Sequence, residues 1–445
     1  MSNIDLVLLG LIKQKSQSAY DIKKNIEYRN IPRWVRISEQ SIYKKVLQLE
    51  SKEYIVSHKE KEGNMPDKAV YTITDKGNDY FNKLMNDISN SDVSLYLDFN
   101  IIITNLDLVD DEQKKILVSN IKSKILELKE LLNERQSHRQ HIPNVGKQMF
   151  KQQLALVETL EAVKDVYDNN KIVGIACAMK NAGIGVGLPD IGRCRITIVD
   201  GEIRVRTSAA CIGQGIATVC KQMVCETIGV DPKLVVVEGP DTHVTPNSGT
   251  TTASRQTVFT GEATRQAALA LKKELETKTL AELEGWDHYA EYSGITDKMG
   301  CDKPNPVSHV AYGYATQVVV LDEAGKVTKV AAAHDVGKAI NPRALEGQIE
   351  GGVVMGLGFA LTEVMPIVKG VPQVKFGTLG LFRATNVPEI ETTIVEKNKA
   401  ELAYGAKGVG EITVIPTAPA VQNAYYKYDG VFRTSLPLEK TAYKK

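Results

Sequence analysis

The sequence predicts a multidomain protein in which an all-α first part is followed by an α+β second part. Glycine marks the division, because four of the 34 glycines lie in residues 1–170 and the other thirty lie in residues 171–445, with all six cysteines. The first part is rich in Lys, Glu, Leu, Asn and Gln, which is typical of helices with polar faces. The second part is rich in Gly, Ala, Val and Thr, which favours sheets and tight turns. A chain of this length allows about three domains.

Charge and hydropathy say little about which classes of partner the chain binds. The net charge of +1 excludes no class of partner. Residues 1–85 carry 15 basic and 11 acidic side chains and residues 86–170 carry 10 and 14, which fits a DNA-binding head before an acidic segment, or chance. No leader pattern opens the sequence, and no apolar run approaches the roughly 20 residues that span a bilayer. We therefore expect a cytoplasmic protein with no membrane partner.

Cysteine spacing indicates no metal site. The six cysteines contain no Cys-x-x-Cys pair and no spacing typical of zinc sites. We expect most of them to be small buried residues, and we assign no metal ligand.

Residues 4–85 are predicted to begin with three helices. The first covers residues 4–12, the second begins at Ser18, and the third begins after Ser38, a good N-cap. Apolar residues recur on one face of the second and third helices. These predicted core residues are Ile22, Ile26, Ile42, Val46 and Leu49.

The outer face of the third helix is short, polar and basic. It carries Gln40, Ser41, Tyr43, Lys44 and Gln48. Amides and hydroxyls can read base edges in the major groove and lysines neutralise phosphates, so this face is a candidate DNA-reading surface. For one helix taken alone, a solvated face is the alternative.

Two alternating strands follow, over residues 54–59 and 68–74, and a further helix starts at Asp75. Three helices and a hairpin are the order of a winged helix-turn-helix.

The segments LVLLGLI, SAYDIKKNIE, ISEQSIYKKVLQLESKEYI and YTITDKG occur in that order over residues 4–85. In order and spacing they resemble the PadR family of transcriptional regulators. The resemblance implies a regulator of double-stranded DNA, with Lys61 and Lys68 contacting phosphates at the tip of the hairpin.

Residues 86–170 are predicted to contain two long helices, the first of which carries an apolar stripe. The stripe consists of Ile116, Leu117, Ile121, Ile125, Leu128 and Leu132. Such a stripe must be covered, either by packing within the head or by a second chain. The PadR resemblance implies the second solution, a homodimer through about residues 111–168. The predicted domains are therefore 1–85 for DNA binding, 86–170 for dimerisation, and 171–445.

Residues 171–445 are predicted to alternate short strands with glycine turns. Hairpins are expected around Asp200-Gly201 and Ala324-Gly325, and helices over residues 220–228 and 260–280.

Three glycine-flanked polar segments, residues 211–219, 245–254 and 403–411, are candidate binding loops. Glycines let backbone N–H groups close on an anion, and Ser and Thr hydroxyls can bind a cofactor rich in heteroatoms. Each segment taken singly can also be an ordinary turn.

Five motifs follow one another over about residues 172–425: GQG, TPNS with its Thr/Ala/Ser tail, DVGKAINP, GQIEG and KGVGE. They resemble the molybdopterin-binding C-terminal half of the molybdenum subunit of the xanthine dehydrogenase and aldehyde oxidase family. The resemblance implies a molybdenum-molybdopterin cofactor and oxidation of a purine, another N-heterocycle or an aldehyde. The cofactor-binding residues that it implies are Gly213, Gln214, Gly215, Ser248, Gly249, Thr250, Gln348, Gly408 and Gly410. It also implies that Glu411 is the catalytic base; a surface charge after a turn is the alternative.

Nothing before residue 172 resembles the first half of that molybdenum subunit. We therefore expect this chain to bind the cofactor weakly by itself, and whether it is an enzyme stays open. The main hypothesis is a PadR-like regulator fused to a partial molybdenum hydroxylase subunit. One alternative is a hydroxylase subunit that needs the first half, together with FAD and Fe–S subunits, from other chains. The other is a natural or artefactual fusion with an inert passenger half.

Overall fold

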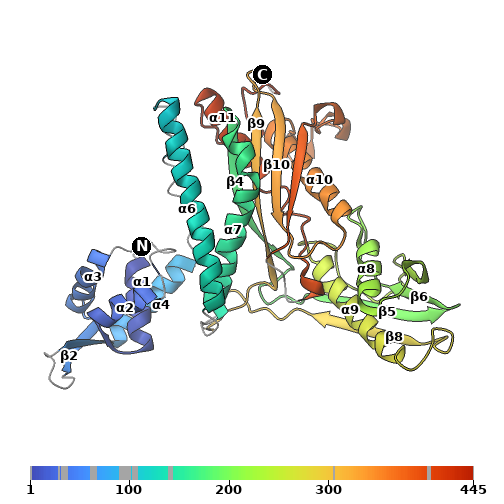
Figure 1. The fold of residues 1–445 in the computed structure, drawn as a ribbon, viewed down its shortest axis with the longest axis horizontal. Helices are drawn as coiled ribbons and strands as arrows, with labels where there is room; N and C mark the ends of the chain where they lie inside the picture. The colour runs from blue at the N-terminus through green and yellow to red at the C-terminus, as the bar shows by residue number, and fades with distance from the viewer. Residues whose placement is uncertain are drawn as a thin grey trace. The chain divides into compact units, whose positions relative to one another are not determined.

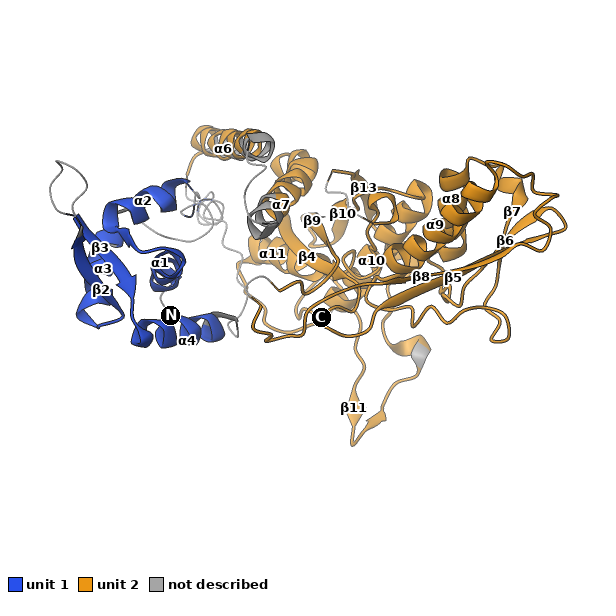
Figure 2. Ribbon diagram, turned by 90° about the horizontal axis from the view of Figure 1, so that it is seen from below, with its two compact units in different colours: residues 1–106 blue, residues 107–445 orange. Residues whose placement is uncertain are grey.

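The computed structural model describes residues 3–28, 31, 39–60, 68–89, 102, 109–138, 144–303, 306–397 and 402–443. The chain forms two compact units, residues 1–106 and 107–445 (Figure 2). The predicted multidomain organisation is confirmed. The finer limits after residues 85 and 170 stay predictions, and the helices of residues 111–168 lie in the second unit. In the described ranges, no helix combines the length and apolar character needed to cross a membrane.

The first unit contains the predicted helices and hairpin, with one short strand added. Its elements are α1 (Asn3–Gln14), β1 (Gln17–Ser18), α2 (Ala19–Tyr28), α3 (Glu39–Ser51), β2 (Ile55–Glu60), β3 (Lys68–Ile73) and α4 (Asp75–Ser89). Strands β2 and β3 form the antiparallel hairpin, and β1 pairs with the other edge of β3. All five predicted core residues are buried in one cluster.

Local contacts explain where α2 begins and how α4 packs. Ser18 Oγ accepts the N–H of Asp21 at 3.2 Å and donates to Asp21 Oδ2 at 2.7 Å, so the two residues cap α2. The Ser18 hydrogen bond is also the main reason that the pKa of Asp21 is lowered. In α4, a Cβ on Gly77 would lie 1.9 Å from the carbonyl oxygen of Tyr54, so only glycine lets the helix pack this closely.

The second unit consists of two four-stranded sheets with helices on their faces (Figure 1). Its helices are α6 (Asp111–His138), α7 (Asn144–Asp168), α8 (Ile216–Ile228), α9 (Gln256–Glu274), α10 (Pro342–Leu361) and α11 (Thr417–Asp429). Its strands are β4 (Val173–Ala182), β5 (Ile191–Val199), β6 (Glu202–Arg206), β7 (Val235–Glu238), β8 (Asp287–Ser293), β9 (Ala311–Leu321), β10 (Val327–Asp335) and β13 (Glu389–Val395), with a small hairpin of β11 (Ile367–Val368) and β12 (Val371–Pro372).

The sheet of order β13-β10-β9-β4 is covered on both faces. Successive side chains of a strand point to opposite faces. Accordingly, Val318 and Val320 pack with Val163 of α7, while Val319 and Leu321 pack with α10 and α11. This sheet is therefore the middle layer of an α/β/α arrangement.

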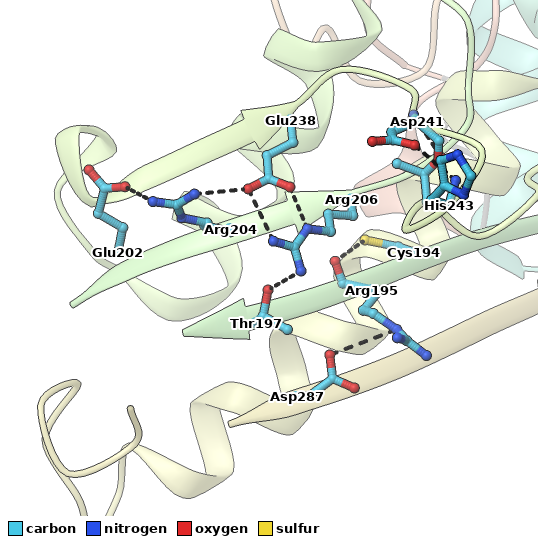
Figure 3. A network of polar contacts seen from close by, with 11 residues as sticks. Cys194, Arg195, Thr197, Glu202, Arg204, Arg206, Glu238, Asp241, His243 and Asp287 are labelled. Atoms are coloured by element: carbon cyan, nitrogen blue, oxygen red, sulfur yellow. Dashed lines mark hydrogen bonds and ion pairs between the residues drawn. The ribbon is translucent and has the colours of Figure 1, made fainter. Parts of the chain in front are cut away.

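The sheet of order β7-β6-β5-β8 is covered by helices on one face only. Helices α8 and α9 bury that face in a large apolar cluster. On the opposite face, Arg204 lies 3.2 Å from Glu238, and Arg206 pairs with Glu238 and donates to Thr197 at 3.0 Å (Figure 3). The charged face is thus internally paired.

Both predicted hairpins are present, as β5–β6 and β9–β10. The two predicted helices are also present, but α8 starts before residue 220 and α9 ends at Glu274. Thr279 Oγ1 and its N–H bind the carboxylate of Glu282 at 2.8 Å, so a separate turn replaces the last residues of the expected helix.

Candidate functional site

A cavity of about 430 Å³ in the second unit is the place where several loops meet. Helices α8, α9 and α10 all begin at its wall, with Gly215, Gln256 and Asn341 among the lining residues. The first N–H groups of a helix have no partner inside the helix and carry a partial positive charge. The cavity is therefore suited to an anionic ligand.

Most of the predicted cofactor-binding and catalytic residues meet at this cavity. Those that line it are Gln214, Gly215, Gln348, Gly408, Gly410 and Glu411. They come from segments that are almost 200 residues apart in sequence, from residue 214 to residue 411, and only the fold brings them together.

The other predicted cofactor residues do not line the cavity. Ser248 is completely buried, and its Oγ accepts the N–H of Arg193 at 2.9 Å and lies 2.6 Å from Thr260 Oγ1. Gly213 and Gly249 are exposed and have positive φ, 113° and 75°, so they shape the turns of their loops. Thr250 offers its carbonyl oxygen to Arg255 at 3.2 Å. These residues support the loops, whereas Thr251 to Thr257 face the cavity.

Arg255 organises the loop of residues 245–254, and sequence reasoning missed it. Its side chain is 1% exposed and forms an ion pair with Asp190, Nε to Oδ1 at 2.5 Å. It also donates to the carbonyls of Ser248 at 2.7 Å and Ile191 at 2.6 Å. The planar guanidinium has five donors, so one buried side chain can hold several backbone carbonyls of a loop in place. An arginine that closes a Ser/Thr-rich loop was the available signal.

The backbone near Glu411 is tightly constrained. Ala253 and Ser254 have φ of 48° and 52°, a left-handed conformation that costs energy for residues other than glycine. A Cβ on Gly408 would lie 1.7 Å from the carbonyl oxygen of Ser254. Glycine at 408 is therefore required for the two loops to approach each other.

Glu411 lies at the cavity wall with its side chain 46% exposed. Ser254 Oγ donates to Glu411 Oε2 at 3.1 Å and accepts the Glu411 N–H at 3.1 Å. Lys180 Nζ is 3.1 Å from the same carboxylate oxygen. The carboxylate is held in one place by these contacts, and it lines the cavity. A group that accepts a proton from a ligand must meet both conditions.

The two glutamines approach the cavity differently. Gln214 is folded onto its own loop, since Oε1 accepts the N–H of Ile212 at 2.6 Å and Nε2 donates to the carbonyl of Ala210 at 3.0 Å. Gln348 is half-buried in α10 and lines the cavity. Gln348 is therefore the better placed of the two to bind a ligand without rearrangement.

Two lysines at the wall were not predicted. Lys338 is half exposed and lies 3.6 Å from Glu396. Lys407 is buried, and its Nζ lies 2.5 Å from Oδ2 of Asp335, which is itself fully buried. Both lysines belong to motifs that the sequence singled out, DVGKAINP and KGVGE. That both lysines line the cavity is a property of the fold and could not be predicted from the motifs.

The residues present fit a molybdopterin-type cofactor. Helix starts and lysines suit its phosphate, and amides and hydroxyls suit a ring with many nitrogen and oxygen atoms. In the described ranges no group of three or more metal-ligating side chains occurs. The fit therefore concerns the organic part of the cofactor.

Cys211 is the one cysteine of the cavity loop. The N–H groups of Gly213 and Gly215, followed by that of Ile216, lower the pKa of its exposed thiol. Burial instead raises the pKa of Cys220 to about 11 and raises that of Cys194 as well. The prediction that most cysteines are buried is wrong: Cys194 and Cys220 are buried, three others are half-buried, and Cys211 is exposed.

In the first unit, the predicted DNA-reading face is partly described. Tyr43, Lys44 and Gln48 of α3 are exposed, with Tyr43 at 45%. Lys68 at the start of β3 is half-buried. The side chains of Gln40 and Ser41, and the whole of Lys61, lie outside the described residues.

Two protein families match this chain. The sequence model described as molybdopterin cofactor-binding domain matches residues 151–293 and 279–388, more than half of the chain. The model described as transcriptional regulator PadR-like family matches residues 8–83.

Individual relatives match the second unit. A xanthine dehydrogenase molybdenum-binding subunit of Escherichia coli O157:H7 is 32% identical over 305 residues, which is 60% of this chain and 40% of that protein. An aldehyde oxidoreductase of Megalodesulfovibrio gigas is 30% identical over 59% of this chain and 31% of its own length. The solved aldehyde oxidoreductase of Desulfovibrio desulfuricans has a TM-score of 0.51 at 27% identity, over 63% of this chain and 33% of that one. The chain thus spans 40% or less of the length of these relatives.

Proposed function

Because this chain belongs to the molybdopterin cofactor-binding domain family and carries a PadR-like segment, we propose that it is a DNA-binding regulator with a cofactor-binding second unit. The observation that carries the cofactor role is the cavity at which α8, α9 and α10 begin. It combines the starts of three helices, two lysines and several of the motif residues in one place. A site of this composition binds phosphate-bearing ligands.

Each part of the cavity has a proposed task. The starts of α8 and α9 receive the phosphate, because the N-cap residues Gly215 and Arg255 make no side-chain cap hydrogen bond to these helices. Gln348 and the hydroxyls of Thr251 and Ser254 bind the ring. The bound cofactor would supply a molybdenum centre for redox chemistry.

The cofactor role is tested by anaerobic titration of the full chain with molybdopterin cofactor, followed by equilibrium dialysis. We expect one saturable site per chain. Gln348→Ala should weaken binding by about tenfold, the loss of one hydrogen bond to a strongly polar partner. Gln373→Ala is the matched control, because Gln373 is exposed, lies outside the cavity and donates to the Val371 carbonyl. Equal affinities of the two variants for the cofactor would contradict the proposal that the cofactor binds in the cavity beside Gln348.

The DNA-binding role rests on the PadR-like segment and the exposed polar face of α3. Lysine contacts to phosphate carry no base information, whereas amides at base edges do. Selection of duplexes from random sequence should yield a preferred site with salt-dependent affinity. Lys44→Ala should weaken all duplexes by a similar factor, and Gln40→Ala should change the preferred base. Failure to select any duplex would exclude this role.

The apolar stripe of α6 supports a homodimer as part of this function. Ile116 is 55% exposed, whereas Leu128 packs on Leu154 and Val157 of α7. The stripe is therefore only partly covered within the chain. Ile116→Glu and Ile121→Glu together should convert a dimer into a monomer, because unpaired charges are costly in an interface. An unchanged mass in light scattering would contradict the dimer.

A second candidate function is that of a molybdenum hydroxylase subunit completed by another chain. Glu411 favours it, because a fixed carboxylate at the cavity can act as general base. The base accelerates a reaction by about a hundred- to ten-thousand-fold, but only on a substrate that is already positioned. We expect the chain alone not to oxidise xanthine or aldehydes with an artificial acceptor. Turnover that appears with an added first-half polypeptide and is lost in Glu411→Gln would establish the hydroxylase.

A further inference from the structure

Helix α7 packs on one face of the sheet of order β13-β10-β9-β4. Its Val163 packs with Val318 and Ala331, and its Thr159 Oγ1 lies 2.8 Å from Thr316 Oγ1. On strand β10, Asp335 points to the same face as Ala331, because their positions differ by an even number. The contact between α7 and the sheet therefore includes a buried carboxylate.

A single buried lysine links that carboxylate to the cavity. Lys407 lines the cavity, and its Nζ lies 2.5 Å from Asp335 Oδ2 and 5.7 Å from the ring centre of Tyr314. The side chains of Lys407 and Asp335 are 5% and 0% exposed. Burial lowers the pKa of Lys407, and the nearby Asp335 and Glu158 oppose this change. Lys407 thus connects the cavity with a buried carboxylate.

The second carboxylate, Glu158, belongs to α7. Its side chain is 5% exposed, and its Oε1 lies 3.4 Å from Lys397 Nζ. Its Oε2 is buried and makes no hydrogen bond with any described residue. Burial raises the pKa of Glu158, and the charge of Asp335 raises it further, against the opposite effects of Lys397 and Lys129. Lys151 of α7 is a further neighbouring charge, and it lowers the pKa of Lys407.

We propose that Lys407 makes the docking of α7 responsive to an anion in the cavity. An anion attracts Lys407 and weakens its pairing with Asp335. Asp335 and Glu158 then repel each other across the contact between α7 and the sheet, in surroundings that screen charge poorly. Occupation of the cavity therefore loosens α7. The inference rests on the proposed anion-binding role of the cavity.

The coupling has a reciprocal consequence. If an anion weakens the docking of α7, then weaker docking of α7 must strengthen anion binding by the same factor. Loosening of α7 would also affect helix α6, since Leu128 of α6 packs on α7 and Lys129 of α6 pairs with Glu161 of α7. Anion binding in the cavity would in this way change the position of the apolar stripe of α6 that we propose for dimerisation.

The test measures hydrogen exchange of α7 in the full chain with inorganic pyrophosphate as probe and chloride at matched ionic strength as control. Calorimetry first establishes binding. Saturating pyrophosphate should then raise exchange of the α7 amides about fivefold or more, the lower range of ordinary coupling between sites. Val163→Ala, which weakens docking without touching the cavity, should tighten pyrophosphate binding.

Variants assign the effect to the buried charges. Glu158→Gln should reduce the pyrophosphate-induced change, whereas Glu161→Gln, on the side of α7 that faces α6, should leave it intact. Lys407→Gln combined with Asp335→Asn keeps the buried site uncharged and should abolish the coupling. Pyrophosphate binding without a change in α7 exchange would overturn the inference and leave the cofactor role standing. No pyrophosphate binding at all would overturn both.

Discussion

Replacement of Arg255 by methionine is the sharpest structural perturbation of the candidate site. Methionine keeps the length of the side chain but removes the guanidinium that pairs with Asp190 and holds two carbonyls of the surrounding loops. Asp190, 1% exposed, would then be a buried charge without its partner. Its other hydrogen bond, from the N–H of Ile184 at 2.7 Å, does not neutralise it.

The expected loss follows from this burial. Removal of one partner of a buried ion pair costs about 3–5 kcal/mol, because the remaining charge is uncompensated. Adding Asp190→Asn should recover part of that loss, since an amide needs no counter-charge. The free energy of unfolding of Arg255→Lys should lie between those of the parent and Arg255→Met, because an ammonium retains the charge but cannot reach both carbonyls and the carboxylate.

Fluorescence of Trp286 during urea unfolding provides the assay, in a Trp34→Phe background that removes the other tryptophan. Trp286 packs against the core under α8 and α9, so it reports unfolding of the unit that contains the cavity. A free energy of unfolding for Arg255→Met within about 1 kcal/mol of the parent would show that the buried ion pair does not stabilise the unit, as would a double variant less stable than Arg255→Met.

Three further predictions concern single side chains. Cys211 should react with iodoacetamide before the other cysteines at neutral pH, because backbone N–H groups lower its pKa; mass spectrometry of the alkylated peptides checks this. Ser18→Ala should reduce the stability of α2 by about 1 kcal/mol in hydrogen exchange at neutral pH. Because the folded-state pKa of Asp21 is lowered, its contribution is present above the unfolded value and lost as pH falls through the folded value, so the difference should shrink in acid. Gly408→Ala should separate the two loops and abolish cofactor retention in dialysis, while circular dichroism stays unchanged.

Much of the fold could be predicted from periodicity and turn chemistry. Ile22, Ile26 and Ile42 fell at helical spacing, and Asp200-Gly201 marked a hairpin, because both patterns depend on neighbours in the sequence. Strand β13 could not be found in this way. It pairs in parallel with β10, which precedes it by a helix and a hairpin, and its pairing is therefore a property of the tertiary structure.

The candidate site shows the same limit. The motifs selected Gln348 and Glu411, which line the cavity, but they did not distinguish cavity-lining residues from supporting ones such as the buried Ser248. Arg255 and Lys407 act through burial and through partners far away in sequence, Asp190 and Asp335. Such pairs are visible only when the chain is folded.

A crystal structure of the full chain with molybdopterin cofactor would show whether the cavity binds the phosphate-bearing cofactor. We expect phosphate density within hydrogen-bond distance of the first-turn N–H groups of α8 or α9, and the ring beside Gln348. Cofactor bound elsewhere on the chain, or a cavity that stays empty of it at saturating concentration, would contradict the claim.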